Sequence, residues 1–165
     1  MKSNRLFFAC VAASFAVLAA PAQADDITCS GKLSQASTDD NIRVPNGASC
    51  ELSGTRIDGN IKVGSNATLI ATGLTVDGDI QAEGAKSVTV RDSRIDGNIQ
   101  LKQGGQARIS GNTVDGDVQL EKNRGALSVS NNRIDGNLQC KENASRPTGG
   151  GNRVDGNKED QCSAL

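Results

Sequence analysis

The chain has 165 residues, with 18 basic and 19 acidic side chains, a net charge of −1 and 2% aromatic residues. All three phenylalanines lie within the first 24 residues, and the chain has no Trp, Tyr or His. Nucleic-acid recognition relies on basic surfaces and aromatic stacking, which this composition does not supply. We therefore expect no nucleic-acid partner.

Residues 1–24 are predicted to be a secretory signal peptide. Lys2 and Arg5 precede an apolar run over 6–20, and Ala22-Gln23-Ala24 has the small residues of a cleavage site. The apolar run is about 15 residues long, whereas a membrane-spanning helix needs roughly 20. We expect the signal to be cleaved, the mature chain to have no transmembrane segment, and the product to be secreted to the periplasm or the cell exterior.

Residues 25–37 depart from the pattern that follows, and we predict that they form an N-terminal cap. The segment 38–153 then repeats an eight-residue motif of the type RIDGNIKV at intervals of 19 or 20 residues. A degenerate copy, STDDNIRV, occupies 37–44. The clear copies begin at Arg56, Thr75, Arg94, Thr113, Arg133 and Arg153. A fixed period of this length indicates stacked structural repeats.

Within each copy apolar and polar residues alternate, which is the pattern of a strand with one buried face. Ile95, Ile99 and Leu101 fall on the buried side of one copy. A second alternating stretch follows in each unit, with the apolar pairs Cys50 and Leu52, Leu69 and Ala71, Val88 and Val90, Ala107 and Ile109, and Leu127 and Val129. One unit cannot bury its apolar side alone, but stacked units can. The sequence predicts an all-β, single-domain parallel β-helix of about seven 19–20-residue coils.

Two segments, ARISGNTVDGDVQL and LSVSNNRIDGNLQC, resemble right-handed parallel β-helix proteins of the pectate-lyase-like type, whose coils often carry Asn at a corner followed by I-x-G-N. The short coils with a glycine after the first Ile are also similar to those of bactofilins, which are filament-forming β-helices. This resemblance implies a right-handed coil. It implies architecture rather than activity.

Stacking would place one aspartate of each copy in a column on the outer surface. This ladder consists of Asp39, Asp58, Asp77, Asp96, Asp115, Asp135 and Asp155. Coils that begin with Arg carry Asn two residues after this Asp, whereas coils that begin with Thr carry a second Asp. We predict that each arginine pairs diagonally with acids of neighbouring coils. The next outward position predicts an amide ladder with bonds from coil to coil, formed by Gln81, Gln100, Gln119 and Gln139.

The aspartate ladder also raises a calcium alternative, because rows of carboxylate and amide oxygens suit a hard cation. The candidate ligands are Asp77, Asp79, Asp96, Asp115 and Asp117. The copies lack the Gly-Gly-x-Gly-x-Asp repeat of calcium-binding β-rolls, and the arginines compete for the same carboxylates. A calcium-binding repeat protein therefore stays an alternative, and no other cofactor is expected.

Four cysteines follow residue 24, an even number that favours disulfides in a secreted chain. Cys29 and Cys50 are 21 residues apart, and Cys140 and Cys162 are 22 apart, each about one coil. Stacked coils bring such residues to about 5 Å, the separation that a disulfide needs. We predict the disulfides Cys29–Cys50 and Cys140–Cys162, with zinc as the alternative. A C-terminal cap is predicted over 154–165, and residues 144–152 are predicted to lack a second strand.

An enzyme alternative follows from the β-helix resemblance, which suggests a polysaccharide lyase or hydrolase. Its base would have to be Arg, Lys or a carboxylate, and Asp115, Asp117 and Arg94 are candidates. Similar residues recur throughout the coils, however, and no insertion is long enough to form a groove wall. We expect no catalytic residues and no enzyme. The expected function is a structural or binding scaffold, with a possible glycan or protein partner on the exposed Arg/Asp/Asn/Gln face.

Overall fold

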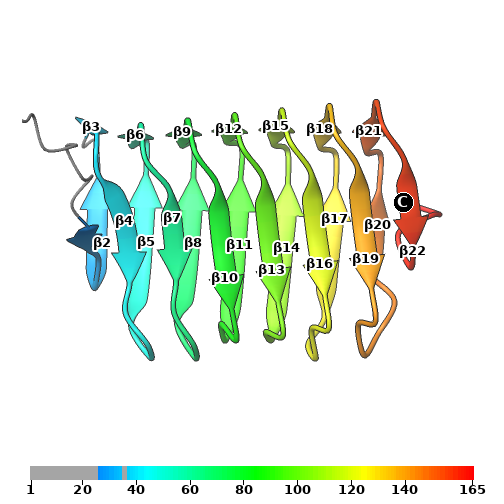
Figure 1. The fold of residues 1–165 in the computed structure, drawn as a ribbon, viewed down its shortest axis with the longest axis horizontal. Coiled ribbons are helices and arrows are strands. Elements are labelled where there is room, and N and C mark those ends of the chain that lie inside the picture. The colour runs from blue at the N-terminus through cyan, green and yellow to red at the C-terminus, as the bar shows by residue number, and fades with distance from the viewer. Residues whose placement is uncertain (1–25, 35–36) are drawn as a thin grey trace, which may run out of the picture.

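The computed structural model describes residues 26–34 and 37–165, which form a parallel β-solenoid of about seven coils. Over these residues the chain has no helix, and therefore none long and apolar enough to cross a membrane. Each complete coil contributes one strand to each of three parallel sheets, and the coils stack along one axis from the N-terminal to the C-terminal end (Figure 1). The predicted all-β solenoid is confirmed, while its handedness stays a prediction.

The three sheets differ in strand length. Sheet A comprises β1 (Asp26–Thr28), β4 (Asn41–Val44), β7 (Ile61–Val63), β10 (Ile80–Glu83), β13 (Ile99–Lys102), β16 (Val118–Glu121), β19 (Leu138–Lys141) and β22 (Lys158–Asp160). Sheet B comprises β2 (Gly31–Ser34), β5 (Ser49–Ser53), β8 (Thr68–Thr72), β11 (Ser87–Arg91), β14 (Gln106–Ser110), β17 (Leu127–Ser130) and β20 (Thr148–Gly150). Sheet C comprises the two-residue strands β3 (Ser37–Thr38), β6 (Arg56–Ile57), β9 (Thr75–Val76), β12 (Arg94–Ile95), β15 (Thr113–Val114), β18 (Arg133–Ile134) and β21 (Arg153–Val154).

The repeat period sets the register of every sheet. Because one period equals one coil, each residue pairs with its own counterpart in the next copy. Ile80 lies beside Ile99 in sheet A, and Arg94 lies beside Thr113 in sheet C. Each position of the repeat thus becomes a column along the rod, which turns an alternating sequence into one apolar interior and polar outer faces.

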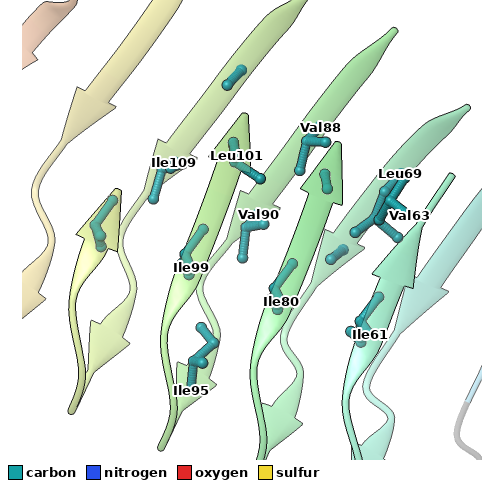
Figure 2. Close-up of a cluster of buried hydrophobic side chains, with 14 of the residues drawn as sticks. Ile61, Val63, Leu69, Ile80, Val88, Val90, Ile95, Ile99, Leu101 and Ile109 are labelled. Carbon is teal, nitrogen blue, oxygen red and sulfur yellow. The ribbon is translucent and has the colours of Figure 1, made fainter. Parts of the chain in front are cut away.

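The interior is a single core of stacked aliphatic side chains. Ile95, Ile99 and Leu101 are buried as predicted, and so are the apolar residues of the second alternating stretch. Figure 2 shows this arrangement: the labelled isoleucines, valines and leucines of successive coils point into the space between the sheets. Burial of each such side chain contributes about 1.5–3 kcal/mol. Aliphatic side chains alone therefore form this core, since the described part of the chain has no aromatic residue.

The corners of the coils change along the rod. Where the N-terminal coils have buried Ala67, Leu74 and Ala85, the C-terminal coils have buried asparagines. Asn112 and Asn132 form part of one such column: the Nδ2 of Asn112 donates to Asn132 Oδ1 at 3.0 Å and to a backbone carbonyl at 3.0 Å. No buried side-chain nitrogen or oxygen in the described residues lacks a hydrogen-bond partner. The buried asparagines at the corners are therefore accommodated beside the apolar core, because their polar atoms are hydrogen-bonded within the protein.

Both predicted disulfides are confirmed. Cys29–Cys50 and Cys140–Cys162 join neighbouring coils near the two ends, with Cα–Cα distances of 5.6 and 5.2 Å. Part of each predicted cap segment continues the sheets, since 26–34 contains β1 and β2 and 158–160 forms β22. The cap boundaries stay predictions. The predicted signal peptide, 1–24, lies outside the described residues.

The expectation of a missing second strand in 144–152 is wrong. Thr148 pairs with Ser128, and Gly149 pairs with Val129, so that β20 extends sheet B to the last coil. The prediction was wrong because the segment lacks the alternation of apolar and polar residues that marks the other strands. Parallel pairing uses backbone groups alone, and Gly149 and Gly150 adopt φ angles of +129° and +150°, which glycine tolerates.

Candidate functional site

The predicted aspartate ladder lies at the corner that follows the strands of sheet C. We call this corner the Asp-Gly edge; it runs from 58–60 in one coil to 155–157 in the last. Strands β9, β12 and β15 are paired in register, and each is followed directly by the ladder residue, Asp77, Asp96 or Asp115. The fold therefore brings the predicted acids into one column on the surface.

Arginines join the aspartates of this column in pairs. Arg94 donates from Nε to Asp96 in its own coil at 2.9 Å and from Nη2 to Asp115 in the next coil at 2.5 Å. Arg56 bridges Asp58 and Asp77 in the same way, at 2.9 and 2.8 Å. Arg133 bridges the last pair of ladder aspartates, at 2.8 and 2.9 Å. The predicted diagonal pairing is confirmed. Each of these three arginines serves two coils, which explains why the coils that begin with Thr75 and Thr113 need none.

The second position of the motif forms a ladder of its own. Asn98 donates to Asp79 Oδ1 from its backbone N–H at 2.7 Å and from Nδ2 at 3.0 Å. Asn98 Oδ1 then accepts the backbone N–H of Asp117 at 2.8 Å. The alternation of Asn with Asp is explained because a carboxylate only accepts hydrogen bonds, whereas an amide also donates. Two neighbouring aspartates in this column would lack the side-chain donor.

The glycine between these positions allows the coils to approach closely. A Cβ at Gly97 would lie 2.6 Å from the backbone oxygen of Gly78, the equivalent glycine of the preceding coil. Gly116 and Gly136 are equally restricted by backbone atoms. The Asp-Gly-Asn repeat thus has a separate structural use for each of its three residues.

Charge pairs lower or raise the pKa of three groups on the surface. A hydrogen bond from Arg153 holds the pKa of Asp155 below its ordinary value; desolvation opposes this shift, and the charge of Arg133 supports it. On sheet A, the hydrogen bond from Lys122 lowers the pKa of Glu121, and the same bond raises the pKa of Lys122. These shifts accompany ion pairs on the surface rather than burial in a cleft.

The acids proposed as calcium ligands already have protein partners. Arg56 binds Asp77, and Arg94 binds both Asp96 and Asp115. Asp79 accepts from Asn98 through Oδ1 and from Gln81 through Oδ2, the latter at 3.0 Å. Asp117 accepts from Asn137 at 2.7 Å. Among the described residues no three acidic or cysteine side chains are grouped to hold a metal ion. A calcium ion would have to displace these donors, and the calcium hypothesis stays a prediction.

The residues considered for catalysis are held by the same interactions. Asp115 is bound by Arg94, and Asp117 is bound by Asn137 and, at 3.5 Å, by Gln119. An acid that stabilises the contact between two coils is poorly placed to exchange a proton or to attack a substrate. Equivalent contacts occur at Asp77 and Asp79, so the coil of Asp115 is not a local exception.

The glutamine ladder is in register, but its hydrogen bonds differ from the prediction. Gln81, Gln100 and Gln119 lie beside one another on neighbouring strands of sheet A. Gln81 and Gln119 donate to the aspartate two residues earlier in their own coils. The expected bonds from coil to coil are therefore wrong at these positions, because a carboxylate within the same coil is the stronger acceptor.

The outward positions of sheet B were missed by the sequence analysis. Arg91 and Arg108 are exposed there, among serines and threonines. The signal was present in the second alternating stretch of each unit, whose polar positions carry cations without acids from residue 68 onward.

The chain matches no protein-family model, no curated protein and no solved structure. The likeness to pectate-lyase-like and bactofilin coils is therefore limited to short repeat motifs. The assignment of a parallel β-solenoid rests on the structure.

Proposed function

We propose that this protein is a secreted, non-catalytic β-solenoid that serves as a structural or binding scaffold in the periplasm or at the cell surface. The observation that carries the proposal is the use of the repeated acids. The carboxylates of the Asp-Gly edge bind arginines or amides that join one coil to the next. The repeated Asp-Gly-Asn motif thus joins the coils of the rod. The outer faces of the sheets are left for contact with a partner.

The two disulfides support the compartment. Cys29–Cys50 and Cys140–Cys162 are consistent with an oxidising environment, since cytosolic proteins seldom keep such bonds. The signal-like composition of residues 1–24 supports export independently of the fold.

Export can be tested with the full chain in a bacterial host. We expect the protein in the periplasmic fraction, with Asp25 as the N-terminal residue by mass spectrometry and no thiol that reacts with a maleimide before reduction. A chain without residues 2–24 is the matched control, and it should remain in the cytoplasm with reactive thiols. Retention of the uncleaved chain in the cytoplasm with all five of its thiols free would overturn the proposal.

The absence of catalysis is tested on the purified, oxidised protein. We expect no release of reducing ends and no unsaturated product from a panel of neutral and acidic polysaccharides. If product does form, Asp117→Asn and Asp79→Asn provide a matched pair of equivalent edge positions. Turnover that is lost with Asp117→Asn but kept with Asp79→Asn would establish the enzyme alternative.

A further inference from the structure

Beyond the Lys32–Glu51 ion pair of its first two strands, the outer surface of sheet B has a different composition from the rest of the rod. We define the sheet B face as the outward side chains of strands β8, β11, β14, β17 and β20. These positions carry Ser, Thr, Gln and Arg together with one exposed isoleucine, Ile70, and they carry neither Asp nor Glu. The whole chain has more acidic than basic residues, so an acid-free face with arginines marks a segregation of charge.

The arginines of this face have no acidic partner. Within the described residues, Arg91 and Arg108 take part in no ion pair, and both are exposed. Arg146, also exposed and without an ion pair, lies two residues before β20. The arginines of the Asp-Gly edge, in contrast, each bind one or two aspartates. The cations of the sheet B face are therefore free to bind an external anion.

Sheet register surrounds each of these arginines with hydroxyl groups. Arg91 lies between Thr72 and Ser110 on the neighbouring strands. Arg108 lies between Thr89 and Ser128. The two arginines are on adjacent strands and offset by two residues, which places their Cα atoms roughly 8 Å apart. The result is a diagonal of cations on a flat surface of hydroxyl groups, and sheet B runs along the whole rod behind sheet A in Figure 1.

This face also contains a shallow hollow of about 330 Å³. Its polar lining is Ser87, Thr89, Gln106, Arg108, Ser128 and Thr148. A hollow of equal volume on sheet A has the acidic Glu83 as well as Lys62 and Lys102 in its lining. The sheet B hollow is therefore the one that combines hydroxyl groups with unopposed positive charge.

We propose that the sheet B face binds an extended acidic polysaccharide, with Arg91 and Arg108 on its anionic groups and the serine and threonine hydroxyls on its sugar hydroxyls. This inference rests on the proposed function, because it names the partner of the binding scaffold. Guanidinium groups present paired donors that match carboxylate, sulfate or phosphate groups. The cations are spread over successive coils instead of converging on one point, which fits a charged polymer better than a single small ion.

The surface is less suited to a protein or a nucleic acid. Protein interfaces concentrate their binding energy in aromatic and other bulky anchors, and the chain after residue 24 has no aromatic residue. Single-stranded nucleic acids bind on stacking platforms, which are absent for the same reason. A hydroxyl-rich face can exchange hydrogen bonds with a polyol along its length.

The proposal is tested with dextran sulfate and dextran, two probes that share a backbone and differ in charge. Binding to the oxidised full protein is measured by isothermal titration calorimetry at low and physiological salt, with alginate as a carboxylate-bearing polysaccharide and poly-glutamate as a polyanion without sugars. The test variant is Arg91→Gln/Arg108→Gln. The matched control is Arg94→Gln/Arg133→Gln, which removes the same charge from the Asp-Gly edge.

We expect dextran sulfate or alginate to bind and dextran not to bind. The sheet B variant should weaken binding by about tenfold for each arginine removed, whereas the edge variant should leave it within about twofold. Equal weakening by both variants would show attraction by net charge alone and would overturn the site. Poly-glutamate bound as tightly as the glycans, or no binding of either acidic glycan, would overturn the proposed partner.

Failure of this inference differs from failure of the scaffold proposal. A protein that is exported, oxidised and inactive toward polysaccharides, but that binds neither acidic glycan, keeps the scaffold and loses the partner. A protein that cleaves one of the glycans loses the non-catalytic scaffold whatever its affinity. Circular dichroism of each variant confirms that it folds before binding is compared.

Discussion

The Asp-Gly edge and the sheet B face both carry arginines, but those of the edge form ion pairs with aspartates, whereas Arg91 and Arg108 of the face form none among the described residues. At the edge, Arg94 binds Asp96 and Asp115 of two coils. On the face, Arg91 is flanked by Thr72 and Ser110 and has no ion pair among the described residues. The comparison teaches that the most regular motif of this chain serves its own assembly. The less regular positions of the second alternating stretch keep their polar groups available for a partner.

The largest expected difference between the two surfaces is in packing. Gly97→Ala should lower the free energy of unfolding by about 1–3 kcal/mol, because its Cβ would lie 2.6 Å from a backbone oxygen of the preceding coil. Ser110→Ala on the sheet B face should change it by less than about 0.5 kcal/mol. Urea denaturation followed by far-ultraviolet circular dichroism measures both. Equal effects of the two substitutions would contradict a tightly packed edge.

A smaller difference is expected when an arginine is removed from each surface. Arg94→Ala leaves Asp96 and Asp115 without their shared cation, and it should cost about 1 kcal/mol at low salt. Arg91→Ala should cost less than about 0.5 kcal/mol. High salt should shrink the first loss because it screens exposed charges. A loss at Arg91 as large as that at Arg94 would show that the face is also part of the internal assembly.

The edge should also affect stability through pH. The lowered pKa of Asp155 means that its contribution to stability is present above the ordinary carboxyl pKa of about 3.9 and is lost as pH falls through the lower folded value. Arg153→Gln should raise the Asp155 midpoint in a carboxyl NMR titration, and its Tm deficit should shrink below about pH 4. Arg91→Gln is the control and should leave that midpoint in place. A midpoint unmoved by Arg153→Gln would exclude the ion pair.

The smallest expected effect is that of calcium. The Tm of the oxidised protein should agree within about 1 °C in millimolar calcium and in chelator, because the edge carboxylates are occupied by arginines and amides. A rise of several degrees that disappears in Asp77→Asn/Asp115→Asn would favour the calcium-binding alternative instead. The same pair of substitutions in chelator measures how much the arginine bridges contribute by themselves.

Much of the candidate edge could be predicted from the sequence, but its hydrogen bonds could not. The alternation of Arg with Thr indicated diagonal pairing, which Arg56 and Arg94 confirm. The predicted acceptor for Gln81 was wrong because the repeat pattern does not show that Gln81 donates to Asp79 Oδ2, a stronger acceptor within its own coil. Likewise, β20 was missed because backbone pairing leaves no side-chain pattern in a run of glycines.

The sequence by itself determined the solenoid, the coil length, the buried columns and the two disulfides. Each of these follows from a period of 19 or 20 residues. Copies of the same motif stack in register, and cysteines about one coil apart are brought to the separation of a disulfide. Only the tertiary structure decided which polar positions are already bound and which are free. Arg94 and Arg91 both lie between hydroxyl-bearing residues on the neighbouring strands, and what separates them is that Arg94 also reaches Asp96 and, in the next coil, Asp115, whereas Arg91 forms no ion pair among the described residues.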